Sequence, residues 1–260
     1  MENAEHLERD YMKSLKIFAK GFNYSQDGPG NRLVYHLCGC NMHCPWCANP
    51  EGMDYHREDK TIRTISSEEI LEEILSCEPM FYDDGGVTFT GGEATLQMDA
   101  LLELMPALQE KNIGVVIETN ATHPMLADLF PYLQLLIADL KHPDSSRLAD
   151  VTGVGGENVY RNLRKAAEVG VPMLIRIPVI HGFNDSTEEI SAFADFLKEL
   201  NTLCSKGSLQ VEFLPYHEYG KEKWNKLGLS YTMTDGFVSA ERICFFEETL
   251  RENGISVIHT

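Results

Sequence analysis

Basic residues are scarce in this chain. Its 260 residues include 22 lysines and arginines against 40 aspartates and glutamates, which gives a formal net charge of -18. Binding to nucleic acid or to an anionic membrane surface depends on clustered positive charge that neutralises phosphates. We therefore expect neither nucleic acid nor a membrane among its partners.

Long apolar runs are also absent. No stretch approaches the roughly 18 consecutive apolar residues that a transmembrane helix needs. The first residues, MENAEHLERDYMK, are polar and acidic, and they lack the basic and then apolar regions of a secretory signal peptide. These two absences predict a cytoplasmic protein. We interpret residues 1 to about 14 as a frayed helix.

Apolar residues are not scarce. They make up 43% of the chain, which is enough for a sizeable core. A length of 260 residues suits one large domain. We expect a single domain over residues 1–260, with its core at about 15–225 and a C-terminal helix and strand at about 234–260.

Short aliphatic runs alternate with helical patterns along the chain. Capping boxes begin helices at Ser66 and Ser186, and Gly170 ends another helix. The runs that we predict to be strands are Leu33–Cys38, Val87–Thr90, Ile113–Thr119, Leu133–Leu140, Met173–Val179 and Leu209–Leu214. Strand–helix alternation of this kind implies parallel strands with right-handed crossovers.

Polar residues at the ends of these runs decide between two architectures. An open doubly wound sheet and a barrel are both compatible with the periodicity. Several runs end in polar groups, such as Asp139 and Lys141, and barrels carry their chemistry at the C-terminal ends of their strands. We therefore predict an α/β fold, a partial (β/α)6 barrel with its active site at that edge.

Four of the seven cysteines fall within ten residues. Without a secretion signal, a disulfide framework is not expected. Cys40, Cys44 and Cys47 lie at i, i+4 and i+7, a spacing that suits a [4Fe–4S] cluster with one iron lacking a protein ligand. The alternative is a zinc site with His36 or His43 as fourth ligand, although structural zinc usually takes two pairs of ligands and no second pair is present.

A second motif, Thr90-Gly-Gly-Glu93, follows the predicted strand Val87–Thr90. Its glycines allow the backbone to approach a ligand closely. Glu93 offers a carboxylate and a backbone carbonyl that can accept hydrogen bonds from an ammonium group. Alone, this motif is weak, because a strand-to-helix turn often needs glycine.

Together these motifs resemble a known superfamily. The pattern C-x-x-x-C-x-aromatic-C, with Trp46 in the aromatic position, is similar to the signature of the radical S-adenosylmethionine (SAM) superfamily. The resemblance implies that the open iron chelates the amino and carboxylate groups of SAM. One electron from the cluster then breaks the S–C5′ bond, and the resulting 5′-deoxyadenosyl radical abstracts a hydrogen atom.

Further segments resemble the glycyl-radical-enzyme activating enzymes within that superfamily. These segments, in chain order, are Asp27–Arg32 (DGPGNR), Glu118–Asn120, Asp139–Lys141, Ile175–Arg176, and Leu214–Gly220 with Lys221 and Trp224. Only Cys77 lies between Cys47 and the Gly-Gly-Glu turn, so an inserted region with extra cysteines is lacking. The chain resembles the short type with one cluster.

The resemblance implies a role for each motif residue. Cys40, Cys44 and Cys47 are expected to ligate the cluster. The residues expected to contact SAM are Trp46, Cys47, Ala48, Gly92, Glu93, Asp139, Leu140, Lys141, Arg176 and His217.

The family also has a monovalent-cation site beside the SAM carboxylate. Its expected ligands here are Glu118, Thr119 and Asp139. The chain departs from the family pattern at two positions, since Glu118 replaces the usual aspartate and Ala121 stands where glycine is frequent.

The resemblance also implies partners. The expected substrate is a glycine in a partner glycyl radical enzyme, and the expected electron donor is flavodoxin or ferredoxin. Such donors are acidic, so docking requires a local basic patch on this acidic chain. Two alternatives remain, a radical SAM enzyme that acts on a small molecule and a non-catalytic zinc-binding interaction module.

Overall fold

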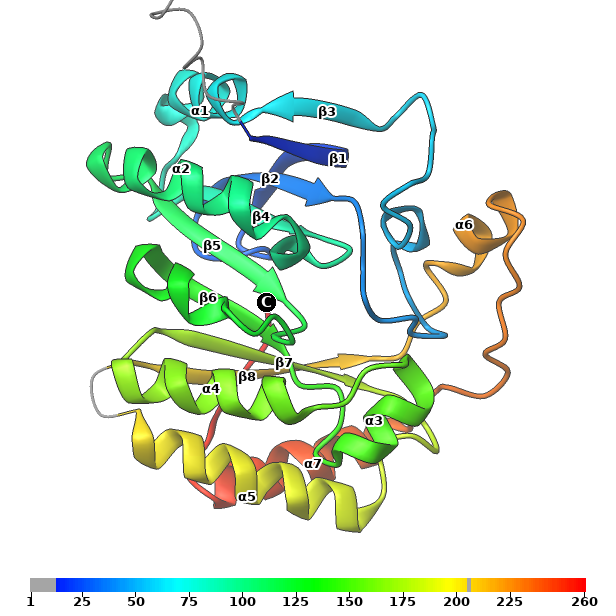
Figure 1. Cartoon of the computed structure of the whole chain (residues 1–260). Coiled ribbons are helices and arrows are strands. Elements are labelled where there is room, and N and C mark those ends of the chain that lie inside the picture. The colour runs from blue at the N-terminus through cyan, green and yellow to red at the C-terminus, as the bar shows by residue number, and fades with distance from the viewer. Residues whose placement is uncertain (1–12, 205–206) are drawn as a thin grey trace, which may run out of the picture.

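The computed structural model describes residues 13–204 and 207–260, so the predicted N-terminal frayed helix lies almost entirely outside the described residues. The described strands form one nine-stranded sheet in the order β3-β1-β2-β4-β5-β6-β7-β8-β9 (Figure 1). The strands are β1 (Ser14–Tyr24), β2 (Asn31–Leu37), β3 (Arg63–Ser66), β4 (Gly86–Gly91), β5 (Gly114–Thr119), β6 (Leu133–Asp139), β7 (Met173–Val179), β8 (Leu209–Pro215) and β9 (Ser256–Ile258).

The parallel part of this sheet confirms the predicted partial barrel. Strands β2 and β4 to β9 pair in parallel, and the six predicted runs correspond to β2 and β4 to β8. Strands β3 and β9 are the two edges, so the sheet is curved but not closed. Because all these strands run the same way, their C-terminal ends meet at one edge of the barrel.

Most helices cover the outer face of the sheet, and the short sixth helix lies apart, beside the loop that follows β2 (Figure 1). They are α1 (Ser67–Ser76), α2 (Met98–Glu110), α3 (Ser145–Thr152), α4 (Glu157–Val169), α5 (Thr187–Leu203), α6 (Lys221–Lys226) and α7 (Ala240–Glu252), with short 3-10 turns at Pro50–Gly52, Glu78–Met80, Ala94–Gln97 and Leu126–Tyr132. Within residues 13–204 and 207–260, no helix has both the length and the hydropathy that crossing a bilayer requires.

The predicted helix boundaries are confirmed where capping chemistry marks them. Ser66 and Ser186 each accept a hydrogen bond from the backbone N–H of the glutamate three residues on, and the carboxylate of that glutamate accepts one from the backbone N–H of the serine. Gly170 ends α4 with a φ of 81°, a left-handed conformation that glycine adopts without steric cost.

Strand β1 was not among the predicted strands, although its 11 residues make it the longest. It runs antiparallel to β2 and β3, with a bulge between Ile17 and Ala19. Four consecutive residues from Ala19 to Phe22 are exposed, so the strand lacks the continuous apolar run of the parallel strands. Successive side chains of a strand point to opposite faces, so both faces of this stretch lie in water, and the apolar signal is lost from the sequence.

The N-terminal end of the barrel is closed by a buried arginine. Arg32, in the DGPGNR segment, is fully buried at the start of β2. Its guanidinium donates to the carbonyls of Val87 (2.9 Å) and Gly114 (2.8 Å) and to the side chains of Thr88 (2.8 Å) and Gln134 (3.1 Å). One side chain thereby ties together the beginnings of four strands, and the opposite end of the barrel is left for the cavity.

Candidate active site

A cavity of about 220 Å³ lies at the C-terminal ends of the strands. It gathers most of the predicted site residues. Those that line it are Cys40, Cys44, Trp46, Cys47, Ala48, Gly92, Glu118, Thr119, Asp139, Lys141 and His217. Glu93, Leu140 and Arg176 do not line it, and each has a different position described below.

The cysteine loop follows β2 and is fixed by backbone hydrogen bonds. Gly39 N–H donates to the carbonyl of Gly52 (2.7 Å), and Cys40 N–H donates to that of Met53 (3.0 Å). Within the loop, Cys47 N–H donates to the carbonyl of Cys44 (3.1 Å). These contacts turn Cys40, Cys44 and Cys47 toward one cavity, and all three are free of disulfides.

The three thiols have the chemistry of cluster ligands. Burial raises the pKa of Cys40 to about 12 and that of Cys44 to about 11, and it also raises the pKa of Cys47. Thiolates in such a place need positive charge beside them, which the irons of a cluster supply. The backbone at Met42 and at Asn49 partly offsets this effect, because it lowers the pKa of Cys40 and Cys47 and so favours the thiolate that a cluster needs. The residues therefore fit a [4Fe–4S] cluster.

A single zinc ion fits less well. Among residues 13–204 and 207–260, no three His, Cys, Asp or Glu side chains are close enough together to hold one metal ion. Cluster ligands stand further apart, because each thiolate binds a different iron. The two histidines proposed as a fourth zinc ligand, His36 and His43, do not line the cavity.

The Gly-Gly-Glu turn packs directly against the cysteine loop. Gly92 N–H donates to the carbonyl of Leu37 (2.9 Å), and Glu93 N–H donates to that of Gly39 (2.7 Å). A Cβ at Gly92 would lie 2.2 Å from the Gly39 carbonyl oxygen and 2.5 Å from that of Gly52. This position therefore excludes any side chain, and the close approach leaves the Gly92 backbone facing the cavity.

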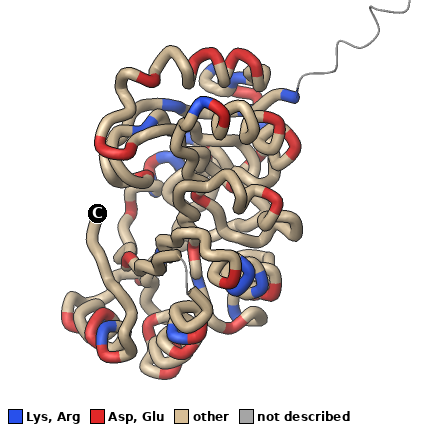
Figure 2. Tube along the Cα trace, turned by 90° about the vertical axis from the view of Figure 1, so that its left-hand side faces the viewer, with Lys and Arg blue, Asp and Glu red and all other residues tan. Residues whose placement is uncertain are grey.

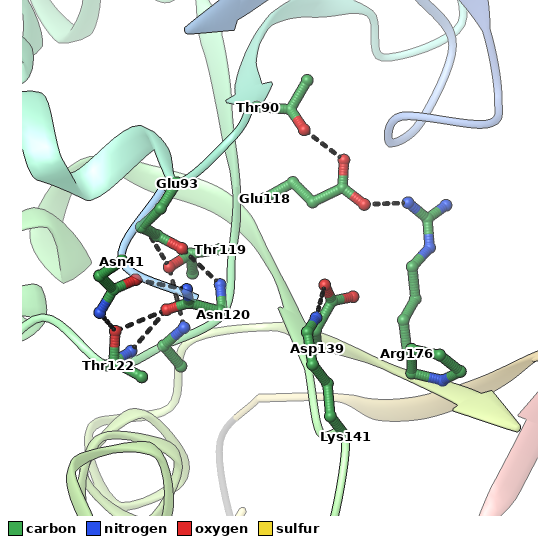
Figure 3. Close-up of polar contacts among 12 residues, drawn as sticks. Asn41, Thr90, Glu93, Glu118, Thr119, Asn120, Thr122, Asp139, Lys141 and Arg176 are labelled. Atoms are coloured by element: carbon green, nitrogen blue, oxygen red, sulfur yellow. Dashed lines mark hydrogen bonds and ion pairs between the residues drawn. The ribbon is translucent and has the colours of Figure 1, made fainter. Parts of the chain in front are cut away.

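Glu93 differs from the expectation. Its side chain is fully buried and accepts hydrogen bonds from the backbone of Thr95 (3.0 Å), the backbone of Asn120 (2.6 Å) and the hydroxyl of Thr119 (2.6 Å) (Figure 3). The carboxylate thus links the loop after β4 to the end of β5. The sequence shows the residue type but not the partners, which come from another strand.

A second polar network holds the loop after β5. The Asn120 side chain donates to Asn41 (2.8 Å) and accepts from the hydroxyl of Thr122 (2.6 Å), while Asn41 donates to Thr122 (2.8 Å) (Figure 3). Ala121 is buried with a φ of 59°, in the left-handed region. This conformation explains why glycine suits this position, because only glycine adopts it without a Cβ clash.

Lys141 is a positively charged side chain that lines the cavity. Its ammonium group forms an ion pair with Asp139 at 2.5 Å, two residues earlier, at the end of β6 (Figure 3). Burial alone would lower the pKa of Lys141, but the carboxylate of Asp139 raises it above its ordinary value. The lysine is therefore charged at neutral pH and can bind a carboxylate at the cavity wall.

Arg176 points into the barrel, as its alternation with Ile175 and Ile177 predicts, but it does not reach the cavity. Its guanidinium forms ion pairs with Glu118 (2.5 Å) and Glu212 (2.9 Å) and donates to the carbonyl of Gln26. The prediction of direct contact with SAM is therefore not supported by its position. Its partners lie on β5 and β8, which the sequence alone could not bring beside β7.

The expected cation ligands line the cavity, but their oxygen atoms have other partners. Glu118 accepts from Thr90 (2.6 Å) and from Arg176, and these two contacts hold its pKa below the usual range although burial alone would raise it. The hydroxyl of Thr119 donates to Glu93, and Asp139 is paired with Lys141. A cation here would compete with these contacts, although the Oδ1 atom of Asp139 is not part of its ion pair with Lys141.

Aromatic and apolar groups complete the wall. Trp46 packs on Phe183 with ring centroids 4.9 Å apart, and Met42, Ile180 and Tyr216 lie around it. His217 lines the same cavity and stacks on Tyr219. Burial lowers the pKa of His217.

Leu140 also departs from the prediction. Its side chain is fully buried in the main core, away from the cavity. Its backbone N–H donates to the carbonyl of Arg176 (2.9 Å). Between Asp139 and Lys141, which face the cavity, the alternating direction of an extended chain sends Leu140 the other way.

The segment after β8 packs against the cysteine loop and donates hydrogen bonds to it. The indole N–H of Trp224 donates to the carbonyl of Cys47 (2.9 Å), and the ammonium of Lys223 contacts Asn49 and Glu51, both at 2.8 Å. A Cβ at Gly220 would lie 2.2 Å from the Cys47 carbonyl oxygen. The sequence showed these residues as part of a motif, but it gave no signal that they contact the third cysteine.

Comparison with known proteins agrees with this site. A family model described as the radical SAM superfamily matches residues 34–197. The chain is 32% identical over 219 residues to the pyruvate formate-lyase-activating enzyme of Streptococcus mutans, covering 80% of each chain. It is 30% identical over 218 residues to the enzyme of that name from Staphylococcus aureus, covering 80% of this chain and 84% of the relative.

Solved structures give the same result. A domain of pyruvate-formate lyase-activating enzyme from Bacteroides vulgatus superposes with a TM-score of 0.54 and 27% identity, covering 67% of this chain and 98% of that one. Streptococcus suis SuiB bound to S-adenosylmethionine has a TM-score of 0.63 at 19% identity, covering 86% of this chain and 49% of that one, which shows the shared fold. The chain therefore belongs to the radical SAM superfamily and, within it, to the family of the pyruvate formate-lyase-activating enzymes.

Proposed function

We propose that this protein activates a glycyl radical enzyme of the pyruvate formate-lyase type. In the overall reaction, SAM, one electron and a glycine of the partner protein give methionine, 5′-deoxyadenosine and a glycyl radical. The observation that carries this proposal is the convergence of three free cysteines and a charged Lys141 on one cavity, in a chain of this family. When bound, the cluster and SAM supply the electron transfer and the hydrogen-abstracting group.

The residues of the chain bind and orient these cofactors. Cys40, Cys44 and Cys47 would hold three irons of the cluster, and they are the cysteines among the described residues that line the cavity. Lys141 offers a charged donor for the carboxylate of SAM, and Asp139 keeps that lysine in place. The backbone at Gly92 is exposed to the cavity beside them.

The same residues exclude water and hold the cavity in shape. The apolar wall of Met42, Ile180 and Tyr216 limits solvent around the reacting atoms. Glu93 and Asn120 join the loops after β4 and β5, so the two sides of the cavity keep a constant separation. Arg176 does not line the cavity, but it forms an ion pair with Glu118, which does.

The proposed partners are a glycyl radical enzyme as protein substrate and flavodoxin or ferredoxin as electron donor. Curated relatives at 30–32% identity carry the name of an enzyme that activates pyruvate formate-lyase, which supports the first partner. The electron donor follows from the need for one electron at the cluster.

An activation assay tests the proposal. The protein is reconstituted anaerobically with iron and sulfide, then incubated with dithionite, SAM and pyruvate formate-lyase, and the mixture is examined by EPR spectroscopy. We expect a glycyl radical doublet, together with one 5′-deoxyadenosine for each radical formed. The Cys44→Ala variant is the control and should give neither product. SAM cleavage that depends on an added small molecule, with no doublet on any glycyl radical enzyme, would refute the proposal.

A further inference from the structure

We propose that Trp224 is a positioning residue that couples the SAM-binding wall of the cavity to the third cluster ligand, Cys47. It acts through residues 217–224, named here the coupling segment, which touch the cavity at one end and the cysteine loop at the other. Trp224 itself does not line the cavity. This inference rests on the proposed function, because it takes the cavity to hold the cluster and SAM together.

The first argument is that the third cysteine is held differently from the other two. The N–H of Cys40 donates to the carbonyl of Met53 (3.0 Å), and the carbonyl of Cys44 accepts from the N–H of Cys47 (3.1 Å), so these bonds lie within the loop. The carbonyl of Cys47 instead accepts from the indole N–H of Trp224 (2.9 Å), which lies 177 positions further along the chain. In the described part of the chain, no backbone N–H donates to this carbonyl. The backbone of the third ligand therefore depends on a tertiary contact.

Close packing is the second argument. Gly220, in the middle of the coupling segment, lies directly against the cysteine loop. A Cβ at this position would stand 2.2 Å from the carbonyl oxygen of Cys47 and 3.0 Å from the Cα of Ala48. Contacts this short leave no space between the two backbones. Because Ala48 lines the cavity, a movement of the coupling segment must displace both the third ligand and the cavity wall.

A lysine adds a further contact between the coupling segment and the cysteine loop. Figure 2 shows many more acidic than basic positions along the trace, and the charge of Lys223 is used for a contact within the chain. Its ammonium lies 2.8 Å from the side-chain oxygen of Asn49 and 2.8 Å from the carboxylate of Glu51. Lys223 and Trp224, which are adjacent, therefore fix consecutive parts of the same loop.

The other end of the coupling segment belongs to the cavity wall. His217 begins the segment and lines the cavity. A second connection passes through Tyr231, whose ring packs on Trp224 with centroids 5.8 Å apart. Its hydroxyl hydrogen-bonds with that of Tyr216 (2.8 Å), another residue of the wall. SAM bound against His217 and Tyr216 therefore restrains Trp224, and with it Cys47. Coupling between two sites is reciprocal, so the cluster strengthens SAM binding by the same factor as SAM strengthens the cluster.

Removal of one N–H group tests the proposal. Trp224→Phe keeps an aromatic ring but no longer donates to the carbonyl of Cys47. In the reconstituted protein, we expect a chelator to remove the iron about fivefold faster than from the wild type, which is the factor that one hydrogen bond contributes. Loss of absorbance near 400 nm measures this rate. Equilibrium dialysis should show weaker binding of SAM, although Trp224 does not line the cavity.

The protection that SAM gives to the cluster separates coupling from a purely structural role. Protection is the rate of iron loss without SAM divided by the rate with saturating SAM. A variant that is merely less stable loses iron faster by the same factor in both conditions, so its protection is unchanged. In Trp224→Phe we expect the protection to fall about fivefold, at the low end of couplings between protein sites. Lys223→Met, which removes the contacts with Asn49 and Glu51, should also lower it.

Tyr35→Phe provides the matched control. It also removes one hydrogen-bond donor from a buried aromatic residue, but the lost bond ends on Glu73 of α1 (2.7 Å) and not on the cysteine loop. We expect wild-type protection in this variant. Equal protection in Trp224→Phe and Tyr35→Phe, or a wild-type protein whose iron loss SAM does not slow, would refute the coupling. Neither measurement uses a glycyl radical enzyme, so a wild-type protein that shows protection but forms no glycyl radical refutes the proposed function alone.

Discussion

The two ends of the barrel use polar residues in opposite ways. At the N-terminal end, Arg32 is fully buried and finds hydrogen-bond partners at the starts of several strands. At the C-terminal end, three free thiols and Lys141 face a cavity. Among the described residues, the buried side-chain atoms without a hydrogen-bond partner are His36 Nδ1, Glu51 Oε2 and Arg57 Nη1, all on β2 or in the loops that follow it.

This contrast separates structural motifs from chemical ones. The DGPGNR segment and the cysteine loop stand next to each other in sequence, and both resemble segments of the same family. Arg32 of the DGPGNR segment finds its hydrogen-bond partners within the chain, which stabilises the fold. The cysteine loop instead presents three thiols to a cofactor. A motif residue whose hydrogen bonds are all made within the chain is therefore expected to affect stability before it affects binding.

The largest effect is expected at the cavity. Replacement of Cys44 by alanine removes one of three cluster ligands, and we expect complete loss of the cluster, measured as iron and sulfide content and as absorbance near 400 nm. The fold should persist, because the thiol faces the cavity. Cys244→Ala is the control, since that exposed cysteine lies on α7 and should leave the cluster intact. Retention of a full cluster in Cys44→Ala would contradict the ligand assignment.

The next effect is expected at the opposite end. Arg32→Leu removes the guanidinium donors from the carbonyls of Val87 and Gly114 and from the side chains of Thr88 and Gln134, which should lower the free energy of unfolding by about 3–5 kcal/mol. Urea unfolding monitored by circular dichroism measures this change. Arg164→Leu removes an ion pair with Glu199 that is over two-fifths exposed, and should cost less than about 1 kcal/mol. Equal losses in the two variants would remove the contrast between the ends of the barrel.

Glu93 lies between these two cases, because it belongs to a cofactor motif but its carboxylate is used internally. Glu93→Gln places an amide NH2 against the N–H of Thr95 or Asn120, and we expect a loss of about 1–3 kcal/mol in the free energy of unfolding. The affinity for SAM, measured by equilibrium dialysis with the reconstituted protein, should fall less than tenfold. If the affinity for SAM fell more than tenfold while the free energy of unfolding stayed the same, Glu93 would be a cofactor ligand and this prediction would be wrong.

The smallest effect is expected at Ala121. Ala121→Gly relieves a left-handed alanine, a gain of about 1 kcal/mol, but it also removes a buried methyl group, a loss of about the same size. We expect the free energy of unfolding to change by less than about 0.5 kcal/mol in urea titrations. Ala121→Val provides the contrast, because a β-branched residue is poorly tolerated at this φ and should destabilise the protein clearly.

The sequence allowed the parallel strands and the cysteine loop to be predicted, since both depend on local patterns. Apolar runs bounded by turn residues predicted β4 and β7 almost to the residue, and the spacing of the cysteines predicted their convergence. Strand β1 was missed because a half-exposed antiparallel strand lacks such a run. Local periodicity carries information only about neighbours along the chain.

The roles of Arg176 and Glu93 could not be predicted for a related reason. Alternation along β7 correctly turned Arg176 inward, but its ion-pair partners Glu118 and Glu212 lie 58 and 36 positions away. The carboxylate of Glu93 likewise meets Asn120 at a distance of 27 positions. Partner choice in the barrel depends on the register between strands, which a single sequence does not contain.

The hydrogen bond between Trp224 and Cys47 has a consequence for biogenesis. Its two residues are 177 positions apart, so the loop that carries the cysteines emerges from the ribosome long before the segment that covers it. During that interval the three thiols are without their outer support. We therefore expect a chain that is truncated before Trp224 to hold its cysteine loop less firmly than the full chain does.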